Sequence, residues 1–322
     1  MIYYLSDKTV VNFTVILGGG MESKFDQIKK LKEEKDAVIL AHYYTEPDIQ
    51  KIADYVGDSY FLSEKAREVK EKVIVMCGVS FMGESVKLLN PNKIVLLPDM
   101  NADCPMAHMA TVEKIKEMRE KYEDLAVVCY VNSTAELKAH SDVCVTSANA
   151  LKIVKNLKNK NIFFIPDQHL ARYISTKLSD KNFIFNDGCC YIHNGITKQD
   201  ILDTKEKYPK AKIAIHPECP LEAVKLGDYV GSTSGIIKYV GESAAEEFII
   251  CTEDGVLYEL KEKNPTKKFY LPKEEVKCTG MKKITIDKII NSLETLEPQV
   301  ELDNEIIKEA NKPLENMLIM AK

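Results

Sequence analysis

Three cysteines recur at nearly regular intervals along this chain of 322 residues. Cys104, Cys190 and Cys278 are 86 and 88 residues apart, and each is followed seven residues later by a threonine typical of a helix N-cap. Thiolates select soft metals, above all iron–sulfur clusters and zinc, and these separations differ from the compact spacing of zinc fingers and ferredoxins. Three equivalent cysteines suit three corners of a cubane whose fourth iron is open to substrate. Such an iron acts as a Lewis acid, which dehydrations and ring closures need.

The remaining cysteines are weaker candidates for metal ligands. Nine cysteines form no CxxC pair, which favours free thiols in a reducing, cytoplasmic compartment over a secreted disulfide framework. Four of them lie within apolar segments and are expected to be buried, and Cys219 is expected to be structural. Repeat spacing alone leaves Cys189 open as a neighbour of Cys190.

Polar residues that could transfer protons recur in phase with the cysteines. Segments 38–59, 127–147 and 213–233 each read as an apolar strand, a polar turn, an amphipathic helix, a short strand and a hydroxyl residue. The spacing of 17 residues is the same in each segment, and it joins three pairs of residues: His42 and Ser59, Tyr130 and Ser147, and His216 and Thr233. The chain is therefore predicted to be triplicated.

The elements that position these residues are buried strands alternating with helices. This pattern predicts an α/β fold of three similar three-layer αβα sandwich domains in a pseudo-threefold arrangement around a central active site. Sites in such units lie at the carboxyl ends of the strands, so the three loops should face one cavity. The predicted divisions are an N-terminal extension, non-native or flexible, over 1–20, α/β repeats over 21–109, 110–194 and 195–281, and C-terminal helices over 282–322 packing back on the first repeat.

From about residue 22 to its end the chain resembles the quinolinate synthase family. The resemblance rests on the segments AHYYTEPDIQKIADYVGDS, GVSFMGESVKLLNP, PDMNADCPM, YVNSTAELKAHSD, GCCYIH, HPECPLEAVKLGDYVGSTSGI and CTGMKKITIDKI. It implies three α/β domains around one site that condenses iminoaspartate with dihydroxyacetone phosphate to quinolinate, phosphate and water, in de novo NAD biosynthesis. It also implies a [4Fe-4S] cluster with three Cys ligands and one open iron, and it selects Cys190 over Cys189 because the family's ligand precedes the histidine by three residues.

The chemistry implied by the resemblance assigns roles to the strand-end residues. Glu218 is the candidate base for a carbon-bound proton, and Tyr44 or His42 would handle the isomerisation. The full expected catalytic set is Glu218, Tyr44, His42, His216 and Tyr130. The expected substrate-binding set is His42, Ser59, Tyr130, Asn132, Ser147, His216, Glu218, Ser232 and Thr233, with the hydroxyl residues near helix starts taking the phosphate.

Other functions remain as alternatives. One is a different [4Fe-4S] hydro-lyase acting on a small dicarboxylate, and another is a binding protein with structural zinc, which the lack of a fourth equivalent ligand disfavours. A net charge of −5 with scattered lysines gives no footprint for nucleic acid, and no apolar run approaches the length of a membrane span. The expected partners are the two substrates and, through the instability of iminoaspartate, an enzyme that produces it.

Overall fold

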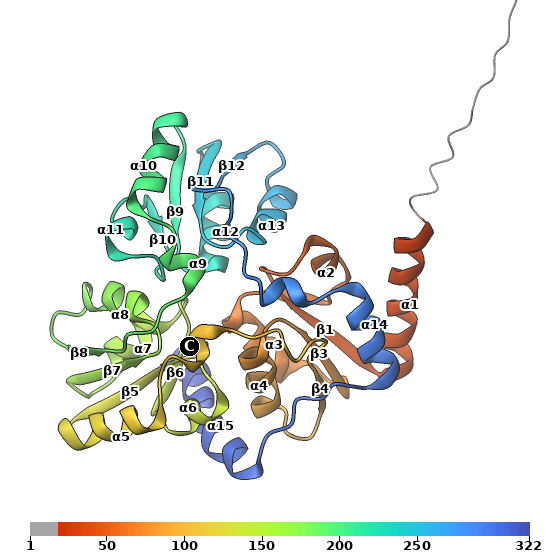
Figure 1. Cartoon of the computed structure of the whole chain (residues 1–322), viewed down its shortest axis with the longest axis horizontal. Coiled ribbons are helices and arrows are strands. Elements are labelled where there is room, and N and C mark those ends of the chain that lie inside the picture. Colours follow the sequence, from red (N-terminus) through yellow and green to blue (C-terminus); the bar gives the residue numbers. More distant parts are fainter. Residues whose placement is uncertain (1–18) are drawn as a thin grey trace, which may run out of the picture.

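The computed structural model describes residues 19–322, and side chains from residue 23 onward. Nearly all of the predicted extension over residues 1–20 lies outside the described residues. The described chain forms three α/β units grouped around a centre (Figure 1). The predicted fold class is confirmed: three parallel four-stranded sheets alternate with helices.

Each unit repeats the same order of strands and helices. The first contains β1 (Ala37–His42), α2 (Pro47–Ile52), β2 (Tyr55–Gly57), α3 (Ser59–Glu68), β3 (Val73–Cys77), α4 (Ser80–Leu89) and β4 (Ile94–Leu96). The second contains α5 (Val112–Lys121), β5 (Leu125–Tyr130), α6 (Ala135–Ala139), β6 (Val143–Val145), α7 (Ala150–Asn156), β7 (Asn161–Ile165), α8 (Gln168–Ser175) and β8 (Asn182–Phe185). The third contains α10 (Lys198–Lys207), β9 (Lys212–Ile215), α11 (Leu221–Val224), β10 (Tyr229–Val230), α12 (Thr233–Glu242), β11 (Glu247–Cys251), α13 (Val256–Lys263) and β12 (Lys268–Tyr270).

All three sheets have the same topology. Their strand orders are β2-β1-β3-β4, β6-β5-β7-β8 and β10-β9-β11-β12, and every pairing is parallel. Along β1, Val38 and Leu40 join one hydrophobic core while Ile39 and Ala41 join another. Both faces of the strand are therefore buried, which explains why its sequence is continuously apolar instead of alternating.

A repeated aspartate ties the second strand of each unit to the first. Asp54, Asp142 and Asp228 each accept a hydrogen bond, at 2.7–2.8 Å, from the backbone N–H of a residue 15 positions earlier in the chain. Each is also paired with a cation, namely Lys32, Arg119 and Lys212 respectively. These aspartates join the first two strands of each sheet at a distance from the carboxyl ends of the strands, so their role is structural.

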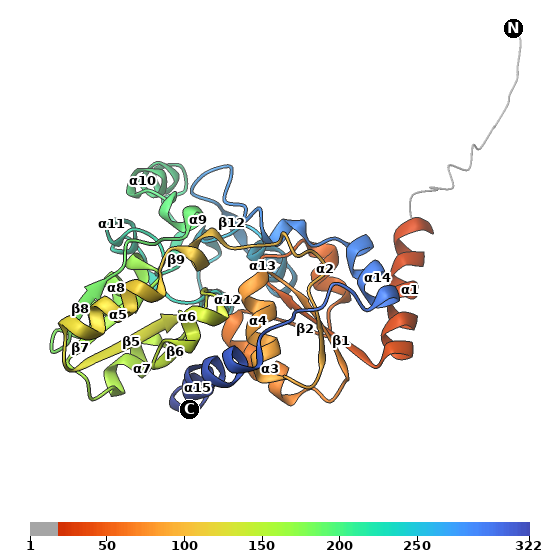
Figure 2. The same cartoon turned by 60° about the horizontal axis from the view of Figure 1, so that its bottom comes forward.

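Two helices end the chain, and the second of them connects two units. Helix α14 (Ile286–Thr295) packs beside α1 (Gly19–Lys35) on the first unit, whereas α15 (Asn304–Met320) lies against α4 of the first unit and α6 and β6 of the second (Figure 2). The expected packing on the first repeat thus covers only part of the contacts of α15. In the part of the chain that the structure describes, no helix has the length and apolar character needed to cross a bilayer.

Candidate functional site

A single cavity collects residues from all three units. Its walls come from residues that end or follow strands of all three sheets, together with the loops that carry the three repeated cysteines, and its volume is about 660 Å³ including its mouth. The lining residues are His42, Tyr44, Asp58, Ser59, Tyr60, Val79, Phe81, Cys104, Tyr130, Asn132, Thr146, Ser147, Cys190, Ile192, His193, His216, Glu218, Thr233, Glu253, Cys278 and Met281. Ligands of parallel α/β sheets bind at this edge, so the cavity is the candidate active site.

The three cysteines have equivalent surroundings. Each is followed by a short helical turn: η1 (Pro105–His108), α9 (Tyr191–Asn194) and η2 (Met281–Lys283). Backbone N–H groups two or three residues further on face each sulfur. Such donors stabilise a negatively charged thiolate, so each loop has the form of a thiolate ligand loop.

The charge balance of these thiols fits a metal group. Burial raises the pKa of all three, that of Cys104 to about 12, and each thiol also lies close enough to at least one of the others to raise or be raised by it. Three neighbouring, half-buried thiols can ionise together only if a cation offsets their charge. Three soft sulfur donors supplied by three separate units therefore fit a cubane iron–sulfur cluster.

The three cysteine loops also touch one another. Tyr191, after Cys190, accepts a hydrogen bond at its hydroxyl from the Thr279 N–H at 3.0 Å. The Cys189 N–H lies 3.4 Å from the sulfur of Met109, in the segment after Cys104. A Cβ placed on Gly280 would lie 2.3 Å from the carbonyl oxygen of Asp103, so the first and third loops meet backbone to backbone.

Gly280→Ala is expected to push the first and third cysteine loops apart. The backbone φ of −63° at this position suits alanine, so the effect comes from the clash with the Asp103 carbonyl alone. We expect the bound iron to fall several-fold. The free energy of unfolding should fall by about 1–3 kcal/mol, as for other overpacked sites. Gly241→Ala is the control, because its Cβ would meet nothing within 4 Å. Full iron content in Gly280→Ala would show that the close approach is dispensable.

His42 and His216 occupy the same position in their units and are held in the same way. The ring Nδ1 of each accepts a hydrogen bond from the backbone N–H two residues further on, at 3.1 Å for His42 and 3.4 Å for His216. This fixes the proton of the neutral ring on Nε2. Burial lowers the pKa of His42 to about 4, against the opposing pull of nearby carboxylates, and that of His216 to about 3, helped by His193. Both rings are therefore neutral donors at pH 7.

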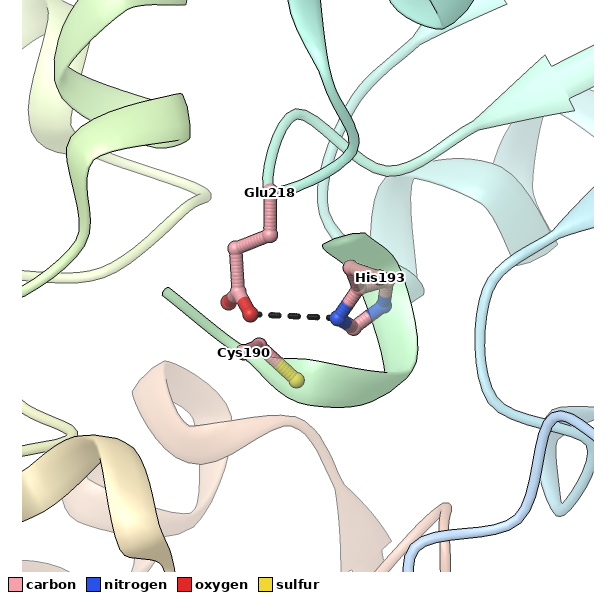
Figure 3. Close-up of side chains that lie close together, drawn as sticks. All are labelled: Cys190, His193 and Glu218. Carbon is pink, nitrogen blue, oxygen red and sulfur yellow. Dashed lines mark ion pairs between the residues drawn. The ribbon is translucent and has the colours of Figure 1, made fainter. Parts of the chain in front are cut away.

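Glu218 lies where the second and third units meet. Its Oε1 accepts a hydrogen bond from the Tyr130 hydroxyl, and its Oε2 lies 3.1 Å from His193 Nδ1 (Figure 3). Burial alone would raise the pKa of Glu218, but His193, His216 and Tyr130 together lower it to about 2. Ligand atoms of Cys190, His193 and Glu218 also lie within 4.8 Å of one another, a spacing compatible with a metal ion. Because His193 and Glu218 are already paired with each other, we expect them to transfer protons instead of binding a metal ion.

A chain of hydrogen bonds continues from His193 into the first unit. His193 Nε2 lies 2.8 Å from the Thr252 hydroxyl, which lies 2.7 Å from the Tyr44 hydroxyl, which in turn lies 2.8 Å from the Thr233 hydroxyl. Burial raises the pKa of Tyr44 well above its usual value, so this phenol keeps its proton at neutral pH. With Tyr130 and Glu218, the chain links all three units by groups that can exchange protons.

The metal-free protein is expected to lose stability as the pH falls from 6.5 to 5. Above pH 6.5 His42 and His216 are neutral in both the folded and the unfolded protein. Below pH 6.5 the two histidines take up protons in the unfolded chain but stay neutral in the folded protein, because their folded pKa values are about 4 and 3. The loss at pH 5 should be about 2 kcal/mol for each histidine. Urea unfolding at pH 7.5 and pH 5 measures it. His216→Asn should remove about half of this pH dependence, while a substitution of the exposed His108 should leave it; equal stability at both pH values would contradict the assignment.

The comparisons with known proteins agree with this geometry. A sequence model of the family described as Quinolinate synthetase A protein matches residues 26–319. The chain belongs to this family. It is 52% identical to the quinolinate synthase of Clostridioides difficile (strain 630) over 296 residues, which cover 92% of this chain and 97% of that relative. It is 53% identical to the quinolinate synthase of Fusobacterium nucleatum subsp. nucleatum over 296 residues, 92% of this chain and 99% of the relative. The family resemblance inferred from the motifs is thereby confirmed.

Nearly all residues expected at the site of a quinolinate synthase lie on the cavity wall of this chain. The exception is Ser232, whose side chain is turned to its own helix: its hydroxyl caps α12 by accepting the Gly235 N–H at 3.2 Å. Cys189 is also absent from the wall, unlike its neighbour Cys190. These placements leave the individual roles as predictions.

Sequence reasoning missed several residues of the network. In the sequence His193 serves only to select Cys190 over Cys189, and nothing marks Thr252 or Glu253. The last two follow β11, the second long strand of the third unit. The repeat carried the necessary signal, because strand β11 is equivalent to β3 and β7, and its end reaches the same edge of the sheet.

Proposed function

We propose that this protein is a quinolinate synthase, an enzyme that condenses iminoaspartate with dihydroxyacetone phosphate to quinolinate, phosphate and water. The observation that carries the proposal is that three thiols, one ionised glutamate and two protonated tyrosines, drawn from three units, line one cavity. Membership of the family and relatives named quinolinate synthase support it.

The proposal assigns Cys104, Cys190 and Cys278 to a [4Fe-4S] cluster. When bound, a cluster with three thiolate ligands supplies one iron with an open coordination position, a Lewis acid for carboxylate or hydroxyl oxygens. The remaining steps rely on the side chains of this chain.

Substrate binding would use polar groups that the protein leaves available. The side-chain oxygens Asn132 Oδ1 and Thr146 Oγ1 are buried and have no hydrogen-bond partner among the described residues. Buried groups of this kind are usually satisfied, so a polar substrate is expected to complete them. Ser59 and Thr233 begin α3 and α12, where helix N-termini favour a phosphate.

Proton transfer would centre on Glu218. Its pKa of about 2 keeps it a carboxylate at neutral pH, able to accept a carbon-bound proton, and the protonated Tyr130 beside it can donate to a developing enolate. Tyr44 and His42, whose rings lie edge to face with centroids 4.5 Å apart, are positioned in the first unit to assist the isomerisation. Neutral His216, 3.2 Å from the Ser147 hydroxyl, would orient the substrate as a donor.

The cellular setting is part of the same proposal. Quinolinate formation serves de novo NAD biosynthesis, and iminoaspartate is too unstable in water to accumulate, so an enzyme that produces it would act in concert. The nine cysteines all lie within the described residues and are all free, which suits a reducing cytoplasmic compartment.

One experiment tests the proposal directly. Protein purified without oxygen is analysed for iron and sulfide, then supplied with dihydroxyacetone phosphate and with iminoaspartate generated from oxaloacetate and ammonia. Quinolinate and phosphate should appear in equal amounts. Iron and sulfide without quinolinate would favour the hydro-lyase alternative, and absence of both would reject the cluster.

A further inference from the structure

The backbone of each repeated cysteine is held by a carboxylate. The Cys190 N–H donates to Asp167 Oδ2 at 3.3 Å, and the Cys278 N–H donates to Glu253 Oε1 at 3.0 Å. In the first unit the Asp103 carboxylate lies beside the Cys104 N–H and accepts the Ser80 hydroxyl proton. A carboxylate anchor therefore lies at the backbone N–H of each of the three ligand cysteines.

Two of the anchors share one position in the repeat. Asp167 stands two residues after the end of β7, and Glu253 two residues after the end of β11. The first unit has Val79 at that position, after β3, and the anchor comes from the cysteine loop itself. Ser80, next to Val79, donates its hydroxyl proton to Asp103. The strand end still holds the cysteine loop, with the donor and the acceptor exchanged.

The anchors are themselves fixed. Asp167 is fully buried, and its other oxygen accepts the Leu170 N–H at 2.6 Å as the N-cap of α8. Glu253 is fully buried, accepts the Gly255 N–H at 2.7 Å, and lies 3.2 Å from the ammonium of Lys282. Burial of a carboxylate is unfavourable unless its oxygens are satisfied, so these side chains have little freedom to move.

We propose that Asp103, Asp167 and Glu253 are positioning residues that hold the backbones of Cys104, Cys190 and Cys278 ready for the metal group. The inference rests on the proposed cluster site and adds residues to it that do not touch the metal. Each ligand loop is fixed on both sides of its cysteine, by the carboxylate at the cysteine N–H and by the helical turn that follows. The three sulfurs then meet the metal without the entropy loss of ordering three separate loops.

Asp167→Asn tests the proposal with little change in shape. The amide oxygen of asparagine can still accept the hydrogen bond from the Leu170 N–H. The amide NH2 then faces the Cys190 N–H and cannot accept a hydrogen bond from it. Asp103→Ala is the second variant, and because the Asp103 side chain is 41% exposed its removal should leave folding intact. Asp303→Asn is the matched control, since Asp303 caps α15 through the Glu305 N–H, on an element that does not carry a ligand cysteine.

Two measurements separate this proposal from the proposed function. The first is binding of Cd²⁺, a soft thiolate-seeking cation, to metal-free protein, followed by the sulfur-to-cadmium absorption band. The second is the rate at which an iron chelator removes iron from the reconstituted protein. Both variants should bind Cd²⁺ about 10–100-fold more weakly and release iron correspondingly faster, as for partners of metal ligands elsewhere, with the control unchanged.

The outcomes are distinct. Unchanged Cd²⁺ affinity in Asp103→Ala and Asp167→Asn overturns the positioning role even if the wild-type protein makes quinolinate, and so does a wild-type protein that binds no Cd²⁺. Weaker Cd²⁺ binding in a protein that never holds iron and sulfide supports the positioning role while rejecting the proposed function. A merely structural role would lower the urea midpoint of the metal-free variants and leave Cd²⁺ affinity in the folded range unchanged; that result also overturns the proposal.

Discussion

Cys190→Ser is expected to lose most of its bound iron and visible charge-transfer absorption, whereas Cys189→Ser is expected to keep both. The two residues are adjacent, but only Cys190 lines the cavity, where its pKa is raised by burial and by the carboxylate of Glu218, with Cys104 and Cys278 adding to the effect. Serine is a poor ligand for soft iron, so a cubane with one thiolate replaced should be held at least about tenfold more weakly.

Cys189→Ser and Cys190→Ser serve as controls for each other, because differences in handling or in oxidation would affect both proteins equally. Iron and sulfide per chain and the visible charge-transfer absorption would be measured on both proteins after the same anaerobic reconstitution. The reverse outcome, iron lost in Cys189→Ser and kept in Cys190→Ser, would mean that the loop adopts a different register when metal binds. Equal retention in both would remove Cys190 from the ligand set.

The repeat explains why so much of the site could be predicted from sequence. Parallel sheets bring the ends of equivalent strands to one edge, so residues in phase, such as His42 and His216, had to reach equivalent places. The matched surroundings of the three cysteines follow from the same argument. The fold class needed only the alternation of apolar strands and helices, because both faces of each sheet are covered.

The contacts between the units could not be predicted from the repeat. The path from His193 through Thr252 to Tyr44 joins three loops distant in sequence, and its geometry depends on how the units pack. The carboxylate anchors were hidden for another reason: the strand-end position holds Asp167 and Glu253 in two units but Val79 in the first, so no common residue type marked it.

Packing of the C-terminal helix was also only partly predictable. The amphipathic periodicity of α15 predicts that one face of the helix is buried. It does not predict which units cover that face. The Glu315 carboxylate pairs with Arg67 of the first unit at 3.3 Å, and the Asn316 amide donates to the Asp142 carbonyl of the second at 3.1 Å. One helix thus spans two units that each supply cavity residues.

Glu218→Gln is expected to lower turnover by about 10²–10⁴-fold while leaving iron content and substrate binding close to normal. Glutamine is nearly the same shape but has one acceptor oxygen instead of two. Its single carbonyl oxygen can accept a hydrogen bond from the Tyr130 hydroxyl or lie beside His193 Nδ1, but it cannot do both. The amide also cannot be protonated near neutral pH. The loss should therefore fall on kcat more than on KM, as for a group that acts in the transition state.

Glu222→Gln makes the same change of charge four residues away, on the exposed side of α11, and should leave turnover unaltered. Thr233→Ala provides the opposite pattern: it removes a hydroxyl 2.8 Å from Tyr44 at the start of α12, so it should raise KM for dihydroxyacetone phosphate more than it lowers kcat. Steady-state rates of quinolinate formation at fixed iron content distinguish the three variants. Near-normal kcat in Glu218→Gln would transfer the base to another group of the network.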